Sequence, residues 1–165
     1  GGAIFGATGG VMEAALRTAA SMLDGNFKKI DFPEVRGTDP IKEAVYEVAG
    51  IEVRVAVTSG LGNARKLLED IKSGKKNYHM VEVMACPGGC INGGGQPVQS
   101  DSIRNYTDLK GLRSKALYDY DRRSELRVSH KSPVVKQIYD EFFDGPGKPR
   151  AHKLLHTEYV KREKY

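Results

Sequence analysis

The sequence predicts an α/β fold, and three observations support this prediction. Segments with apolar residues at helical spacing alternate with short β-branched segments, as expected when helices cover a sheet. A chain of 165 residues can bury one hydrophobic core, which favours one domain or a domain with an appendage. A glycine-rich loop follows one β-branched segment, and sites in α/β folds form beyond the carboxyl ends of strands.

The beginning of the chain is predicted to contain one helix and one strand. The helix is predicted over residues 7–23, because Thr8-Gly9-Gly10 opens it, apolar residues recur along one side, and Gly25 closes it. Residues 27–32 are predicted as a short strand followed by a loop.

The middle of the chain is predicted to supply the rest of the sheet. Residues 45–48 and 52–58 predict a strand pair, or one bent strand, around Gly50, with alternating valines on one face. A second helix is predicted over residues 63–73, where apolar residues return to helical spacing. Residues 78–84 are predicted as a strand that leads directly into the glycine-rich loop.

The composition changes after Ser102. Helices are predicted over residues 103–120 and 133–143, followed by a Gly-Pro-Gly break and a polar tail. This half of the chain has too few apolar residues for a core of its own. We therefore expect it to pack on the first half.

Residues 82–97 contain the only two cysteines, Cys86 and Cys90, in a C-x3-C spacing within the densest glycine cluster. Two cysteines at this spacing do not make a disulfide framework, so metal ligation or a redox role is favoured over a disulfide. From the spacing alone, a pair of structural thiols remains an alternative. Glycines allow close approach of the backbone, and amide donors suit the sulfides of an iron–sulfur cluster. A 4Fe–4S cluster normally takes four protein ligands, of which this chain can supply two.

Residues 82–97 resemble the third cluster-binding motif of the iron-only (FeFe) hydrogenases. Residues 5–18 resemble the start of that family's active-site helix, and residues 60–68 are also similar. Ser129–Pro133 and Leu154–Tyr159 resemble the small-subunit segment that wraps the catalytic domain. The family's Thr-Ser-Cys-Cys-Pro and Met-Pro-Cys motifs, which carry the other two cluster ligands, are absent. The resemblance therefore implies the C-terminal part of a catalytic subunit.

This resemblance implies a fold and a domain division. Residues 1–100 are expected to form the C-terminal lobe of the hydrogenase catalytic domain, a parallel sheet flanked by helices. Residues 101–165 are expected to form a helical wrap and tail like the small subunit.

The resemblance also implies the roles of five residues. Cys86 is expected to be a ligand of the 4Fe–4S cubane, and Cys90 the ligand shared by the cubane and a diiron centre, which together form the H-cluster. Phe5 is expected to shield the diiron site, the Gly6 amide to reach its small ligands, and Met84 to fill space beside it with a soft thioether. No catalytic acid or base can be assigned in this chain.

Without the resemblance, several of these features have simpler interpretations. The glycine-rich turn would be a helix N-terminus that binds an anion, and Met84 a core residue at the end of a strand. Glu13 and Glu82 are interpreted as structural carboxylates. His79 is placed on a predicted strand. His130, His152 and His156 are expected to cap helices or dock the tail rather than to complete a zinc site with the cysteines.

The implied function of the intact protein is reversible oxidation of dihydrogen to protons and electrons. Three alternatives remain open: a hydrogenase-like iron–sulfur assembly factor, a sensory homologue that keeps the H-cluster and turns over slowly, and a non-catalytic module that completes a partner chain. Because two thiolates leave half of a cubane without protein ligands, we expect the 165-residue chain alone to be inactive.

The expected partners are H2, protons, the N-terminal part of the catalytic domain and an electron carrier. Ferredoxin, a nicotinamide-nucleotide-linked subunit or a cytochrome would be selected by N-terminal domains with further iron–sulfur clusters. The formal charge is +5, but basic and acidic residues are interspersed, which disfavours nucleic-acid binding. No apolar run is long enough to span a bilayer and no signal-peptide pattern is seen, so the expected location is cytoplasmic.

Overall fold

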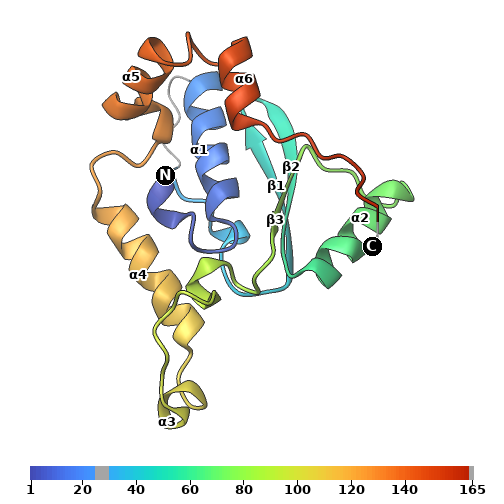
Figure 1. Cartoon of the computed structure of the whole chain (residues 1–165), viewed down its shortest axis with the longest axis vertical. Helices are drawn as coiled ribbons and strands as arrows, with labels where there is room; N and C mark the ends of the chain where they lie inside the picture. Colours follow the sequence, from blue (N-terminus) through green and yellow to red (C-terminus); the bar gives the residue numbers. More distant parts are fainter. Residues whose placement is uncertain (25–29, 164–165) are drawn as a thin grey trace. The chain divides into compact units, whose positions relative to one another are not determined.

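The sheet is the central element of the computed structural model, which describes residues 1–24 and 30–163 (Figure 1). Within those residues the sheet has three strands in the order β1-β2-β3. β1 (Ile41–Val48) and β2 (Ile51–Ser59) pair antiparallel, whereas β3 (Met80–Met84) pairs parallel with β2. The predicted α/β class is confirmed, but the sheet is mixed rather than parallel. Ala49 and Gly50, both at positive φ, make a tight hairpin connection, which can join only antiparallel neighbours.

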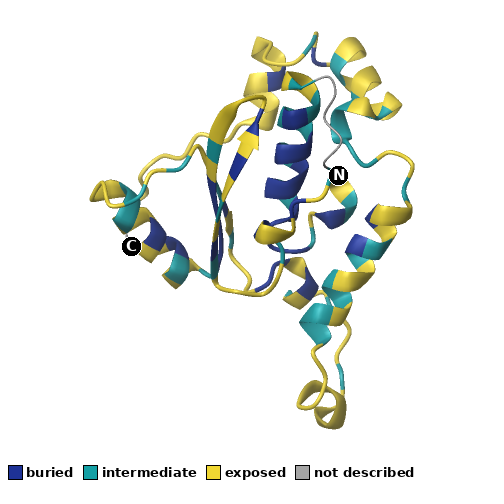
Figure 2. Cartoon of the chain, turned by 180° about the vertical axis from the view of Figure 1, so that it is seen from behind, coloured by how far each residue is buried: buried dark blue, intermediate teal, exposed yellow. Residues whose placement is uncertain are grey.

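α1 (Gly10–Leu23) packs across one face of the sheet and confirms the helix predicted over residues 7–23, with a later start (Figure 2). Burying each large apolar side chain contributes about 1.5–3 kcal/mol, so packing holds this helix in place. The core on this face consists of Met12, Leu16, Ala20, Phe32, Val35, Tyr46, Val48, Val55 and Val57.

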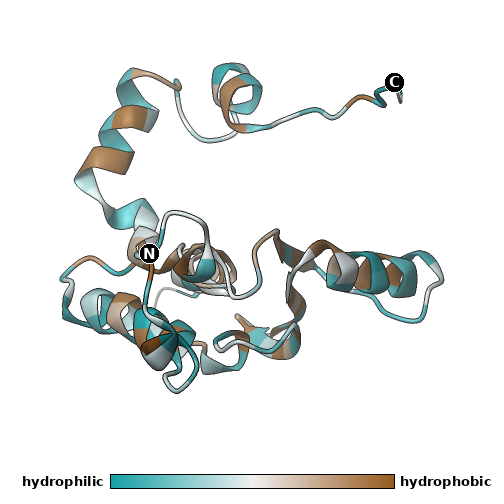
Figure 3. Cartoon of the chain, turned by 60° about the horizontal axis from the view of Figure 1, so that its bottom comes forward, coloured by the Kyte–Doolittle hydropathy of each residue, from teal (hydrophilic) through white to brown (hydrophobic). Residues whose placement is uncertain are grey.

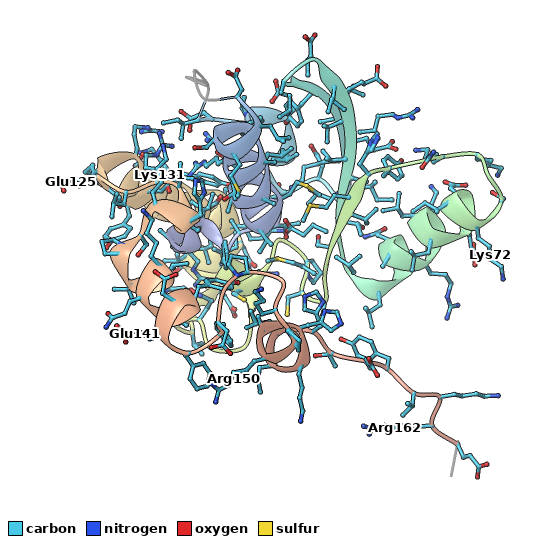
Figure 4. The ribbon with its side chains drawn as sticks, turned by 90° about the horizontal axis from the view of Figure 1, so that it is seen from above. Lys72, Glu125, Lys131, Glu141, Arg150 and Arg162 are labelled. Carbon is cyan, nitrogen blue, oxygen red and sulfur yellow. The ribbon has the colours of Figure 1, made fainter. Side chains whose placement is uncertain are left out.

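α2 (Leu61–Lys72) connects β2 to β3 and completes a βαβ unit, which is how these neighbouring strands come to run parallel. Its buried residues are Ala64 and Leu67, whereas Lys72 points away from the strands (Figure 4). The helix predicted over residues 63–73 and the strand predicted over residues 78–84 are both formed, with small differences at their ends.

The strand predicted over residues 27–32 is wrong in its described part. Residues 27–29 lie outside the described residues, and Ile30–Phe32 have no regular secondary structure. The Ile30 carbonyl accepts a hydrogen bond from Arg17 Nε at 2.7 Å, and the Phe32 ring lies 4.9 Å from the Tyr46 ring in the core. Side-chain contacts therefore take the place of a strand ladder here.

The helix predicted over residues 103–120 is interrupted. It consists of a short α3 (Asp101–Arg104) and a longer α4 (Leu109–Arg123). Asp108 caps α4 by accepting a hydrogen bond from the Gly111 amide at 2.9 Å, which starts a new helix at this point. Tyr118 of α4 joins Ile4, Ala7 and Ile91 in a second apolar cluster, so α4 packs on the first half of the chain as predicted.

The described chain divides into two compact units, Gly1–Ser129 and His130–Tyr165. The boundary predicted between residues 100 and 101 rests on motifs and stays a prediction.

The charged side chains labelled in Figure 4 are exposed, each within its own unit. None of the described helices is long and apolar enough to cross a lipid bilayer.

The second unit contains α5 (Pro133–Glu141) and α6 (Pro149–Leu155). Figure 3 shows apolar turns on α5, in agreement with the helix predicted over residues 133–143. α6 lies where the sequence predicts only a polar tail. Pro149 pre-sets the first turn of α6, and Arg150 donates to the Phe142 carbonyl at 3.0 Å while its guanidinium stacks on the Phe142 ring, which stabilises this helix locally.

A buried ion cluster joins α1 to α4. The guanidinium of Arg17, which is 1% exposed, donates to both carboxylate oxygens of Asp121 at 2.9 Å and to Glu13 at 2.8 Å. Asp121 is also 1% exposed and accepts a further hydrogen bond from Arg127. Buried charges are strongly unfavourable unless they are paired, so these residues depend on one another.

Glu13 extends this cluster toward the loop that precedes β1. Its carboxylate accepts two hydrogen bonds from Arg36, at 2.8 and 2.6 Å, and Arg36 also pairs with Asp31. The guanidinium of Arg36 lies 4.5 Å from the centre of the Tyr118 ring. Glu13 therefore holds Arg17 and Arg36 together through ion pairs, which agrees with its interpretation as a structural carboxylate.

Candidate metal centre

The cysteine loop, residues 86–95, begins at the carboxyl ends of the two parallel strands. Ser59, the last residue of β2, is paired with Met84, the last residue of β3. The Gly60 amide continues this pairing by donating to the Met84 carbonyl at 2.8 Å. The loop therefore lies at the edge of the sheet where sites form in α/β folds.

The cysteine loop is folded on itself by its own backbone. The Gly89 amide donates to the Cys86 carbonyl at 2.9 Å, and the Gly93 amide donates to the Cys90 carbonyl at 3.0 Å. Residues Cys90–Asn92 form one turn of 3-10 helix. Both cysteines are free and exposed, so a metal group could reach their thiols.

The N-terminal glycine turn, Phe5–Gly10, is hydrogen-bonded to this loop in both directions. The Thr8 amide donates to the Gly88 carbonyl at 3.1 Å, and the Ile91 amide donates to the Gly6 carbonyl at 3.1 Å. The Gly88 amide in turn donates to the Ser59 hydroxyl at 3.2 Å. Two motifs that are far apart in the sequence are thereby held in one place.

Gly89 lies where the glycine turn, β3 and the cysteine loop meet. Its φ is +92°, and a Cβ atom here would lie 2.7 Å from the Gly6 carbonyl oxygen and 2.9 Å from both the Met84 sulfur and the Thr8 nitrogen. Such distances are far below van der Waals contact, so only glycine fits. The close approach between backbone segments that the glycine content predicts therefore occurs at Gly89.

The structure brings together most of the predicted site residues. Gly6 and Met84 converge on the loop that carries Cys86 and Cys90. Phe5 adjoins Gly6, and its side chain is 44% exposed rather than part of the core. Met84 is half-buried. The individual roles of these five residues toward a cofactor stay predictions.

Sequence reasoning missed the support that α4 gives to the loop. Arg113 donates to the Ile91 carbonyl at 3.0 Å and to the Pro97 carbonyl at 3.3 Å. Tyr118 packs on Ile91, and burial raises the pKa of its phenol. No pattern in the sequence distinguishes Arg113 from the many exposed arginines, so only the tertiary contacts identify it.

The ligand set within the described residues is limited to the two thiols. No group of three or more His, Cys, Asp or Glu side chains in residues 1–24 and 30–163 is placed to hold a metal ion. His79 Nδ1 accepts a hydrogen bond from the Arg54 amide, and the rings of His152 and His156 stack on each other. The cysteine pair is therefore an incomplete metal site by itself.

Family models match nearly the whole chain. Residues 1–94 match the model of the iron-only hydrogenase large subunit, C-terminal domain, and residues 107–162 match that of the iron hydrogenase small subunit. The chain belongs to the iron-only hydrogenase family. The glycine turn and both cysteines lie within the large-subunit match, whereas α4, with Arg113 and Asp121, lies within the small-subunit match.

Curated relatives include hydrogenases. The chain is 46% identical over 162 residues to the NADP-reducing hydrogenase subunit HndD of Solidesulfovibrio fructosivorans, covering 98% of this chain and 27% of the relative. It is 43% identical over 161 residues to iron hydrogenase 1 of Clostridium pasteurianum, covering 97% of this chain and 28% of the relative. The chain therefore spans little more than a quarter of the length of these two relatives.

A further curated relative is named for iron–sulfur assembly rather than for hydrogenase activity. The chain is 35% identical over 161 residues to the cytosolic iron-sulfur assembly component 3 of Mus musculus, covering 96% of this chain and 32% of the relative.

Solved structures of iron-only hydrogenases match the fold. The FeFe-hydrogenase HydA1 from Chlamydomonas reinhardtii matches with a TM-score of 0.70 and 38% identity, covering 94% of this chain and 45% of that one. Two further FeFe-hydrogenase structures also match, one concerning stepwise H-cluster assembly and one concerning oxygen inactivation at the 2Fe subcluster of the H cluster.

Proposed function

We propose that this chain forms part of the catalytic site of a hydrogenase that interconverts dihydrogen with protons and electrons. The observation that carries the proposal is the contact between the cysteine loop and the glycine turn, through Thr8–Gly88 and Gly6–Ile91 hydrogen bonds. Both segments resemble hydrogenase motifs, and the fold places them together at the strand ends.

The residues present fit part of an H-cluster. Cys86 and Cys90 offer two accessible soft thiolate ligands, which iron–sulfur clusters require. The Thr8 hydroxyl is buried beside the loop and has no hydrogen-bond partner among the described residues. We propose that Cys86 binds the 4Fe–4S cubane and that Cys90 is shared with the diiron centre. When bound, the H-cluster would supply the redox chemistry and a site for hydrogen.

The remaining residues would shape the pocket. Gly89 lets the loop backbone approach the glycine turn closely, which would bring amide donors toward the cluster. Phe5 and Met84 would exclude water with apolar and thioether groups that do not donate protons. The Gly6 amide would face the small ligands of the diiron centre. No side chain of this chain is assigned to carry the proton.

We propose H2, protons and the N-terminal part of the catalytic domain as partners. A nicotinamide-nucleotide-linked electron partner is supported by the similarity to an NADP-reducing hydrogenase subunit, with ferredoxin and a cytochrome as the other candidates. Further iron–sulfur clusters in N-terminal domains and a cytoplasmic location stay predictions.

The second candidate function is iron–sulfur cluster assembly without hydrogen turnover. It is favoured by the 35% identity to an assembly component over 96% of this chain. The two functions differ in the diiron centre, whose carbonyl and cyanide ligands have infrared stretching bands. A sensory homologue would share those bands but turn over slowly.

Reconstitution with iron, sulfide and a synthetic diiron precursor tests the proposed function. We expect the intact protein to show carbonyl and cyanide bands and to evolve hydrogen. We expect the 165-residue chain to be inactive, because its two thiolates leave half of a cubane without protein ligands. An intact protein that binds iron but lacks these bands would support the assembly function. Activity of the 165-residue chain alone would contradict the two-ligand argument.

The substitutions Phe5→Ala and Met84→Ala test the shape of the pocket. We expect each to shift or broaden the infrared bands of the loaded intact protein. The unfolding midpoint of the cofactor-free chain should change little, because Phe5 is 44% exposed and Met84 is only half-buried. Leu16→Ala is the matched control, since Leu16 is 4% exposed and its truncation should cost about 2–5 kcal/mol. A loss of stability in Phe5→Ala as large as in Leu16→Ala would make Phe5 a core residue.

A further inference from the structure

Glu82 attaches the start of α1 to β3. Its side chain is buried, and the two carboxylate oxygens accept hydrogen bonds from the Gly9 amide at 2.6 Å and the Met12 amide at 2.7 Å. These amides are among the first of the helix, which have no partner within it. Gly9, the N-cap residue, has no side chain to cap them. The cap therefore comes from a strand 73 and 70 positions away.

Lys42 holds the same turn from the other outer strand of the sheet. The strand register aligns Lys42 of β1 with Val57 of β2 and Val57 with Glu82 of β3, so both charged residues share one row on one face. The Lys42 ammonium is buried and donates to the Thr8 carbonyl at 3.2 Å and to the Gly37 carbonyl at 2.7 Å. Burial lowers the pKa of Lys42, and the negative charge of Glu82 opposes this shift.

The turn that these two residues hold is the one that contacts the cysteine loop. Thr8 lies between the Lys42 contact at its carbonyl and the Gly88 contact at its amide. Glu82 belongs to the strand that ends at Met84 and leads into Cys86. A change in how Glu82 binds α1 would therefore move the glycine turn relative to the thiols.

We propose that Glu82 and Lys42 are positioning residues that fix the glycine turn against the cysteine loop, and so set Phe5 and Gly6 relative to Cys86 and Cys90. The inference rests on the proposed function for its catalytic consequence. A carboxylate that only capped a helix could come from the N-cap itself, whereas this carboxylate also ties the helix to the strand that carries the metal ligands. Glu82 holds the turn by accepting from a backbone amide, and Lys42 holds it by donating to a backbone carbonyl.

Hydrogen exchange in the cofactor-free 165-residue chain tests the positioning role. In Glu82→Gln an NH2 group, which cannot accept, replaces one of the two oxygens that each bind one backbone amide. We expect the Thr8 and Ile91 amides to exchange at least about tenfold faster relative to the Val55 and Val57 amides of β2, as for loss of a charged buried hydrogen bond. Lys42→Met keeps the apolar stem but loses the contact to Thr8, and should accelerate Thr8 in the same way.

Tyr46→Phe is the matched control, because Tyr46 is buried on the same sheet face but bonds Glu34 rather than the glycine turn. It should leave the ratio of turn to β2 exchange unchanged. Uniform acceleration of all these amides in both Glu82→Gln and Lys42→Met would overturn the proposal, since both residues would then act on global stability alone.

A second measurement separates this inference from the proposed function. In the loaded intact protein, Glu82→Gln should shift the carbonyl and cyanide bands, and unshifted bands would overturn the effect of positioning on the cofactor. Absence of such bands from the unsubstituted protein would overturn the proposed function instead. The exchange ratio would then still decide whether Glu82 and Lys42 hold the turn.

Discussion

Cys90→Ser in the intact protein should abolish hydrogen turnover together with the infrared bands of the diiron centre. In our proposal Cys90 joins two metal units through one soft sulfur atom, and a serine oxygen is a harder donor that would not hold both. We expect activity to fall by more than about 100-fold. Mutation of a residue that only hydrogen-bonds a metal ligand typically costs about 10–100-fold, and loss of a ligand should cost more. Hydrogen evolution, iron content and infrared spectra measure the effect.

Cys86→Ser is the matched comparison, because a hard ligand at one corner of the cubane should cost less than at the shared position. Both cysteines are exposed in the described chain, so neither substitution should change the unfolding midpoint of the cofactor-free chain. Near-normal hydrogen evolution and an intact diiron signature in Cys90→Ser would refute the shared-ligand role.

Asp121→Ala should produce a large loss of fold stability. It would leave Arg17, which is 1% exposed, without the carboxylate that accepts two of its hydrogen bonds, and would remove one partner of Arg127. Breaking a buried ion pair on one side typically costs about 3–5 kcal/mol. We expect a decrease of this size in the free energy of unfolding in urea. Because Asp121 joins α4 to α1, the loop contact through Arg113 should loosen as well.

Asp119→Ala is the control on the same helix. Asp119 pairs with Lys115 and Arg122 at the surface, where ion pairs are weak, so its loss should change stability much less. Equal destabilisation by the two substitutions would contradict the special role of the buried cluster.

The same cluster should make the fold sensitive to acid. The hydrogen bond from Arg127 outweighs burial and, with Arg36, lowers the pKa of Asp31 to about 2. Burial alone would raise the pKa of Asp121, but hydrogen bonds from Arg17 and Arg127 bring it below its usual value. These carboxylates therefore stabilise the folded chain above their unfolded pKa of about 3.9, and this stability is lost as pH falls toward about 2. In Asp121→Ala the free energy of unfolding should decrease less as the pH falls, as measured by urea unfolding at each pH.

Much of the fold could be predicted from local patterns. The apolar stripe of α1, the alternating valines of β2 and the helical spacing in α2 identify these elements, because their burial follows from a period that the sequence displays. The position of the cysteine loop after β3 followed in the same way. The strand predicted over residues 27–32 failed in its described part, because contacts with distant side chains outweighed the local preference for a strand. The Ile30 carbonyl, for example, accepts a hydrogen bond from Arg17.

The sequence by itself determined the α/β class, the candidate metal ligands Cys86 and Cys90, and the motifs that point to the hydrogenase family. Only the tertiary structure decided that Glu82 and Lys42 hold the glycine turn and that Arg17 binds Asp121, 104 positions away. In a sequence such charged residues look like solvated surface. Whether they are buried and paired depends on which strands and helices come together, and the free energy of a buried charge is decided by that distant partner.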